Sequence, residues 1–375
     1  MPTWGAIGRA LQPFLNPGGT GGSSDLIGAG GLDARGCVVA VGSIGDHATE
    51  LIAHHTRDLV RWHAPVLQGA DPESLHQMRV SMRRLRATLQ QFAPALVLPK
   101  GVSDQRLAKS VRRLGMARDL DVLRGRLEQD LLPQLSGSDA KTLRPVVKQL
   151  RRERLLAHEH LQEVLQSSQH LALVSQLQRW LKRPAFTAWG SLPLQAWLAD
   201  IQLPALGELW FHPGWQLQEC GAEASTLHDL RRAIKTVRYR LEAFKPLAGA
   251  ASRRGIDQLK RAQELLGDYN DLQVLRQAID GQLHQGLAEA LPSLDRLLET
   301  QQNACWLVWR QLAQAISASP SRRSLVQGLV ADQRRLERSL WWIALGRRVW
   351  PFHERSLPHL AWRSRCLALK SWISA

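Results

Sequence analysis

Residues 75–86 read LHQMRVSMRRLR, and residues 227–238 read LHDLRRAIKTVR. In both stretches a histidine is followed by basic residues at intervals of three or four, the spacing that places side chains on one face of an α-helix. The two stretches align without a gap at an offset of 152 residues. This repetition predicts that the chain contains two copies of one helical unit.

The same offset matches positions within these stretches and beyond their C-terminal ends. Arg83 is matched by Lys235, so a positive charge is retained there although the residue differs. The identical pairs are Leu75/Leu227, His76/His228, Arg79/Arg231, Arg86/Arg238, Leu89/Leu241, Phe92/Phe244 and Pro94/Pro246, followed by Leu107/Leu259, Leu114/Leu266, Gly115/Gly267, Asp119/Asp271, Leu120/Leu272, Val122/Val274, Leu123/Leu275 and Arg124/Arg276.

Composition and periodicity indicate an all-α fold. The middle of the chain is rich in Leu, Ala, Gln, Arg and Glu, which favour helix, whereas the residues that favour strands are sparse. We predict two pseudo-symmetric, antiparallel four-helix bundles that arose by internal duplication. The expected organisation is a Gly/Ser/Pro-rich flexible leader at 1–45, a helical domain at 46–320 with its first repeat at about 46–183, a connector at 184–224 and its second repeat from about 225, and a basic Trp/Arg-rich segment at 321–375, part of which could complete the second repeat.

The chain carries a formal net charge of +16, and most of its cations are arginines. A surplus of this size is typical of proteins that bind a polyanion, such as nucleic acid, an anionic membrane or a phosphate polymer. Arginine favours phosphate because its planar guanidinium can bind two oxygens at once.

Other classes of protein are disfavoured by what the sequence lacks. The four cysteines are far apart and form no CxxC pair, so we expect neither a zinc site nor a disulfide framework, and a reducing cytoplasm suits them. No apolar run approaches the roughly 18 residues that a membrane span requires, and the first residues lack the apolar core of a signal peptide.

The basic residues of each repeat occupy a face distinct from the apolar one. On a helical wheel, His76, Arg79, Arg83 and Arg86 fall within an arc of about 80°, centred about 110° from the apolar stripe of Leu75, Met78, Met82, Leu85, Leu89 and Phe92. A third face, which holds Arg84, shares nothing between the two copies. We therefore expect a constraint on the His/Arg face, and we expect the loss of Arg84 to matter least.

Two opposed basic faces would gather six cations and two histidines, a repulsive arrangement that a bound polyanion would relieve. The alternatives are a solvated basic face and, for each histidine, a structural hydrogen bond or cap. Asp119 and Asp271 recur in the next helix of each copy and are predicted to orient arginines through ion pairs. No catalytic residues and no metal site are expected, because acidic residues are few near each basic face.

The stretches LHQMRVSMRRLRATLQQF and LGMARDLDVL, repeated as LHDLRRAIKTVRYRLEAF and LGDYNDLQVL, resemble the CHAD family, the conserved histidine α-helical domain. The resemblance covers about residues 46–320. It implies two four-helix bundles around a basic central cavity, binding of inorganic polyphosphate, and association with cytoplasmic polyphosphate granules. It also implies ligand contacts by His76, Arg79, Arg83, Arg86, His228, Arg231, Lys235 and Arg238, with Lys109 and Arg261 as further candidates.

Family members often carry a triphosphatase-like module with a Glu-x-Glu-x-Lys signature, which this sequence lacks. We therefore expect a binding protein that is not an enzyme and uses no cofactor. A nucleic-acid binder is the second hypothesis, although the basic helices offer few aromatic side chains for base stacking. An enzyme acting on phosphate chains is the third. The sequence leaves open the oligomeric state and whether the C-terminal segment contacts a membrane surface.

Overall fold

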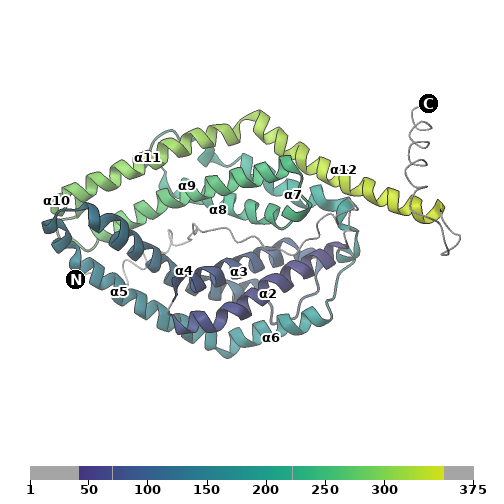
Figure 1. Ribbon diagram of the computed structural model, residues 1–375, viewed down its shortest axis with the longest axis horizontal. Helices are drawn as coiled ribbons and strands as arrows, with labels where there is room; N and C mark the ends of the chain where they lie inside the picture. The colour runs from purple at the N-terminus through teal and green to yellow at the C-terminus, as the bar shows by residue number, and fades with distance from the viewer. Residues whose placement is uncertain (1–41, 70, 222, 350–375) are drawn as a thin grey trace, which may run out of the picture. The chain divides into compact units, whose positions relative to one another are not determined.

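The computed structural model describes residues 42–69, 71–221 and 223–349. Within these ranges the chain is helical apart from short connections, and its β-type pairing is limited to two isolated bridges, which confirms the all-α prediction. The α-helices are α2 (Ile44–Gln68), α3 (Pro72–Gln91), α4 (Asp104–Gly125), α5 (Gly137–Gln166), α6 (Ser168–Lys182), α7 (Leu194–Trp210), α8 (Ala224–Glu242), α9 (Ala250–Asp280), α10 (Leu287–Ala290), α11 (Pro292–Ser317) and α12 (Ser319–Val349) (Figure 1).

The chain divides into two compact units, the first ending at Leu336 and the second beginning at Glu337. The described part of the second unit, residues 337–349, is the C-terminal portion of α12. The first unit contains two halves, which we define as α2 to α6 and α7 to the part of α12 that ends at Leu336. In the part of the chain that the structure describes, no helix is both long enough and apolar enough to cross a membrane.

Local sequence signals set the boundaries of α3, the helix that carries the first basic face. Gly69 ends α2 with φ of +68°, a left-handed conformation that glycine adopts without strain. Asp71 then caps α3 by accepting hydrogen bonds from the backbone N–H groups of Glu73 and Ser74, at 2.9 and 3.1 Å. Pro72 occupies the first turn, where its missing N–H has no partner to lose.

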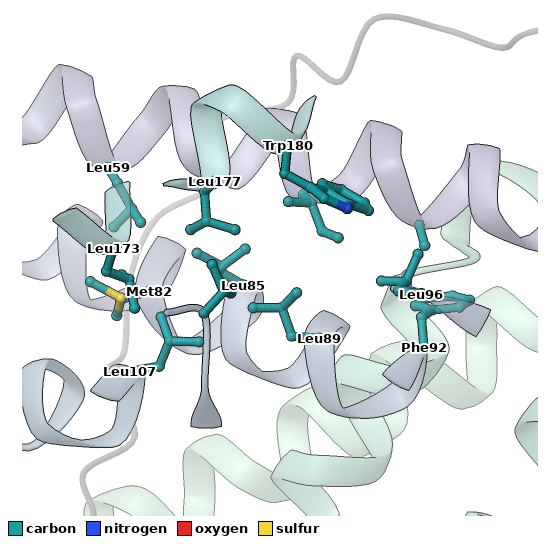
Figure 2. Packing of buried hydrophobic residues seen from close by; sticks show 14 of the residues in the cluster. Leu59, Met82, Leu85, Leu89, Phe92, Leu96, Leu107, Leu173, Leu177 and Trp180 are labelled. Carbon is teal, nitrogen blue, oxygen red and sulfur yellow. The ribbon is translucent and has the colours of Figure 1, made fainter. Parts of the chain in front are cut away.

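The apolar stripe predicted on this helix forms the core of the first half. Six side chains from Leu75 to Phe92 are at most 6% exposed, which confirms the stripe. They pack against α2, α4 and α6, as Figure 2 shows for Met82 and Leu85 among Leu59, Leu107 and Leu177. Because the stripe is buried here, the orientation of α3 is determined, and its basic face must point elsewhere.

The second half has its own core, built from α7, α8, α9, α11 and α12. Leu230 and Ile234 of α8 are fully buried there beside Trp309 of α11. Leu325 and Leu329, both beyond residue 320, pack in the same core. The predicted connector at 184–224 contains α7, a helix whose N-terminal leucines join the first core and whose C-terminal leucines join the second.

The two halves meet through two separate apolar contacts. At one contact, Leu123 and Leu127 share a cluster with Leu272 and Leu275. At the other, the rings of Phe92 and Phe244 meet edge to face, with centroids 5.8 Å apart. Along α3 and α8 the basic residues come before Phe92 and Phe244, which form the second contact. Along α4, Asp119 comes before Leu123, which belongs to the first contact. The basic faces therefore lie between the two apolar contacts.

Candidate functional site

The basic faces of α3 and α8 are largely withdrawn from solvent, and these two helices contact each other across the boundary between the halves. Most charged side chains of a solvated face would be exposed, so that alternative does not describe these two helices. His76, Arg79, Arg83, His228, Arg231 and Arg238 are buried, Lys235 is half-buried, and Arg86 is partly exposed.

Cations from both halves converge at the centre of this face. Burial holds the pKa of the Lys235 ammonium well below its ordinary value, and the charges of Arg83, Arg231 and Arg79 lower it further. Since Arg79 and Arg83 belong to α3 whereas Arg231 and Lys235 belong to α8, the structure brings the two basic faces together. We call these four residues, with Arg238, the basic cluster.

Burial makes the basic cluster unfavourable for cations. It lowers the pKa of Arg79 to about 9, and the neighbouring Arg83 acts in the same direction. Burial likewise lowers the pKa of Arg231, which is 1% exposed. Removing a guanidinium from water is costly unless anionic groups compensate, so the cluster has a strong electrostatic preference for an anion.

Two acids lie close to Arg79 and Arg231 of the cluster, Asp119 of α4 and Asp271 of α9. A carboxylate oxygen of Asp119 lies 3.8 Å from the Arg79 guanidinium. Burial nevertheless raises the pKa of Asp119 to about 7, because the opposing effect of Arg79 is partly offset by repulsion from Asp271. Burial also raises the pKa of Asp271. Even with Glu242, which pairs with Arg238, these acids are fewer than the five cations of the cluster, and the raised pKa values of Asp119 and Asp271 weaken their negative charge further.

Tyr239 is a member of this site that does not belong to the basic face predicted from the sequence. The guanidinium carbons of Arg238 and Arg83 lie 4.6 and 5.5 Å from its ring centroid, so the ring links cations from both halves. Arg238 also donates to Gln263 at 3.1 Å and pairs with Glu242. The sequence could have indicated Tyr239, because this aromatic residue directly follows Arg238 of the basic face. The first repeat has no aromatic residue at the equivalent position.

The two histidines occupy equivalent settings. Burial lowers the pKa of His76, and Arg118 of α4 lowers it further. Burial also lowers the pKa of His228, whose Nδ1 lies 3.3 Å from the side-chain oxygen of Asn270 in α9. Arg118 and Asn270 are themselves 152 residues apart. A lowered pKa favours the neutral imidazole, which has a single N–H. In neutral His228 that N–H is Nδ1–H and faces the Asn270 oxygen, whereas the N–H of neutral His76 can be donated to an anion.

Three predicted contacts lie apart from the basic cluster. Arg86 binds both carboxylate oxygens of Asp104 at 2.7 and 2.8 Å, at the start of α4. Lys109 is exposed and lines a separate cavity of about 140 Å³ between α4, α5 and α6. Arg261 is exposed on α9. Arg86 lies farther along α3 than Arg79 and Arg83, beside the N-terminal end of the antiparallel helix α4, and this position explains why it binds Asp104.

Arg84 has a partner that the sequence analysis did not anticipate. Its guanidinium lies 3.6 Å from a carboxylate oxygen of Glu242, which belongs to α8 in the other half. Half-exposed ion pairs contribute little to stability, typically about 1 kcal/mol or less. Arg84 nevertheless touches the residue that also holds Arg238, so exposed arginines of α5 are cleaner controls for the experiments proposed below.

Comparisons with known proteins identify a family and similar folds. The CHAD domain family model matches residues 50–280. The crystal structure of the CHAD domain from the plant Ricinus communis is similar at a TM-score of 0.50 and 25% identity, covering 79% of this chain and 94% of that chain. PptA from Streptomyces chartreusis is similar in fold at a TM-score of 0.56 and 20% identity, covering 73% of this chain and 100% of that chain. No curated protein matches the chain.

Proposed function

This chain belongs to the CHAD domain family, and from that premise we propose that it binds inorganic polyphosphate through the basic cluster without catalysing a reaction on it. The observation that carries the proposal is the convergence of Arg79 and Arg83 from α3 with Arg231 and Lys235 from α8. A phosphate chain carries a negative charge on each unit, so it can neutralise several cations at once. Each arginine can donate two parallel hydrogen bonds to phosphate oxygens.

Polyphosphate fits this site better than single-stranded nucleic acid does. Base stacking requires an accessible aromatic face, but Phe92 and Phe244 are buried against each other and the ring of Tyr239 lies beside two guanidinium groups. A phosphate chain has no bases and needs only the cations. The proposal is for binding alone because Asp119 and Asp271 lie among arginines, where they are suited to orienting those cations.

We expect long-chain polyphosphate to bind more tightly than single-stranded DNA of equal charge, in direct competition at physiological ionic strength. For single-stranded polyanions the logarithm of the binding constant falls by about 0.7 per neutralised phosphate for each unit of log salt. Five cluster cations therefore predict a slope of roughly −3 to −4. Binding measured over a salt series gives both quantities, and equal competition by DNA would contradict the proposal.

Tyr239 provides a reporter within the site. Burial acts to raise its pKa, but Arg83, Arg238 and Arg84 together bring it below the ordinary value, whereas burial raises the pKa of Tyr269 to about 12. These are the two tyrosines of the chain. We expect bound polyphosphate to raise the pKa of Tyr239, because it neutralises the arginines that stabilise the tyrosinate.

The measurement is an ultraviolet titration of tyrosinate with and without polyphosphate. Tyr239→Phe should abolish the earlier titration step, leaving the step of Tyr269. An early step that does not move when polyphosphate binds would place the ligand away from the basic cluster.

In cells, the proposal places the protein in the cytoplasm at polyphosphate granules. The double variant of Arg79 and Arg231 described in the Discussion should lose this localisation if granule association depends on the cluster. Release of phosphate from polyphosphate by the purified wild-type protein in the presence of magnesium would show that binding is not the whole activity.

A further inference from the structure

A second group of ligating side chains lies on α2, outside the basic cluster. One ligand atom from each of His54, His55 and Asp58 lies within 4.8 Å of the other two. Two imidazole nitrogens and a carboxylate oxygen form a donor set that suits zinc and related divalent transition metals. This group has no role in polyphosphate binding as proposed above.

The helix itself brings these three side chains together. Consecutive residues of an α-helix are about 100° apart, so position 58 projects at about 40° when positions 54 and 55 are set at 0° and 100°. Side chains also tilt toward the N-terminus of their helix. The Asp58 carboxylate therefore lies between the two histidines and over their turn, and its Oδ2 is 3.5 Å from Nε2 of His54.

Burial differs within the group in the way that a binding site requires. His55 is 7% exposed, and its Nδ1 is buried without a hydrogen-bond partner in the structure. An imidazole nitrogen in this position loses its hydration without compensation, unless a ligand occupies the space beside it. The side chains of His54 and Asp58 are 32% and 29% exposed, so the group is open to solvent on one side.

Neighbouring side chains on α3 support and limit the group. Ser81 donates a hydrogen bond to Oδ2 of Asp58 at 3.4 Å, an outer contact of the kind that orients metal ligands. The charge of Arg84 acts on His55, which disfavours a cation nearby. That charge is partly neutralised by Glu242, 3.6 Å from the Arg84 guanidinium.

We propose that His54, His55 and Asp58 bind one divalent transition metal ion, with zinc the best match to two nitrogens and one oxygen. Three protein ligands leave the fourth tetrahedral position to water or to an exogenous ligand on the solvent side. The site is distinct from the basic cluster, so its occupancy does not depend on whether the chain binds polyphosphate.

The test uses the full chain without a polyhistidine tag. Calorimetric titration with zinc at neutral pH should show one site that His54→Ala and Asp58→Asn each weaken by more than about a hundredfold. Ser81→Ala should weaken it less than either ligand variant does, by about 10- to 100-fold, the typical effect of losing an outer contact. Cobalt(II) added to the same proteins should give visible absorption in the wild type and lose it in both ligand variants.

His160→Ala, an exposed histidine on α5, is the matched control and should bind zinc like the wild type. Zinc should also raise the melting temperature of the wild type but not that of Asp58→Asn, because a ligand that binds only the folded state stabilises it. Wild-type zinc affinity in both His54→Ala and Asp58→Asn, or no zinc binding by the wild type, would overturn the proposal. The double variant of Arg79 and Arg231 should retain zinc binding, which separates failure here from failure of the polyphosphate proposal.

Discussion

Replacing Arg79 and Arg231 together with glutamine is expected to weaken polyphosphate binding by about a hundredfold or more. A hydrogen bond to a charged group contributes about 1.5–3 kcal/mol, and each 1.4 kcal/mol corresponds to a tenfold change in affinity. Two such losses, one in each half, therefore predict a decrease of roughly 10²- to 10⁴-fold. Binding of labelled long-chain polyphosphate at physiological ionic strength gives the measurement.

The expected loss of polyphosphate affinity depends on the position of the removed charges. The control variant must therefore remove the same number of positive charges from the surface outside the basic cluster. Arg144 and Arg152 are exposed on α5, and Arg144→Gln/Arg152→Gln changes the net charge by the same amount. Charges on an exposed surface are screened by salt, and this control should change affinity by no more than about threefold. If both double variants lose affinity equally, binding follows net charge and the basic cluster is not the site.

A third variant separates charge from geometry. Arg79→Lys/Arg231→Lys keeps both positive charges but loses the planar fork that binds two oxygens at once. We expect its affinity to lie between those of the wild type and the glutamine variant. The wild type, the glutamine variant and the lysine variant should be compared by thermal unfolding, because Arg79 and Arg231 are only 4% and 1% exposed and replacing buried side chains can change stability as well as affinity. The raised pKa of Asp119, about 7, allows that carboxyl to become neutral when Arg79 is removed.

Phe244→Ala and Phe92→Ala are each expected to lower the free energy of unfolding by about 3–5 kcal/mol, the usual cost of truncating a buried aromatic side chain. Both rings are almost fully buried where the two halves meet. His47 of α2 adds to this contact, because it stacks on Phe244 at 5.2 Å and its Nε2 lies 2.9 Å from the carbonyl oxygen of Ala243. The contact holds α3 beside α8 and therefore keeps the two basic faces together.

Chemical denaturation of the single and double variants measures this contribution. Because the two rings touch, the double variant should lose less or more than the sum of the single losses, with a coupling of about 0.5–3 kcal/mol. Phe211 provides the matched control: it is 90% exposed, and Phe211→Ala should change the free energy of unfolding by no more than about 0.5 kcal/mol. Additive losses at Phe92 and Phe244 would mean that the contact between the halves is not maintained in solution.

Composition and periodicity predicted the helices, and the apolar spacing from Leu75 to Phe92 predicted the buried face of α3. The repeated His/Arg stretches, together with LGMARDLDVL and LGDYNDLQVL, carried the family resemblance. These features depend on side chains close in sequence, because the spacing of apolar residues determines which face a helix buries. The same reasoning predicted a basic face that includes His76, Arg79 and Arg83, which the structure buries together. It could not separate Arg86, because only the packing of α3 against α4 places that side chain beside Asp104.

Tertiary structure also decided which residues from different halves meet. Tyr239 is unremarkable on its own helix, but α3 places Arg83 beside its ring. Asp119 and Asp271 are ordinary acids in the sequence, and their pKa values are raised by burial and by the carboxylates that the fold places near them. The sequence thus determined the helices and the charge each one carries. Distances between charges on separate helices depend on packing, and those distances, with the loss of water around each group, determine how strongly the site prefers an anion.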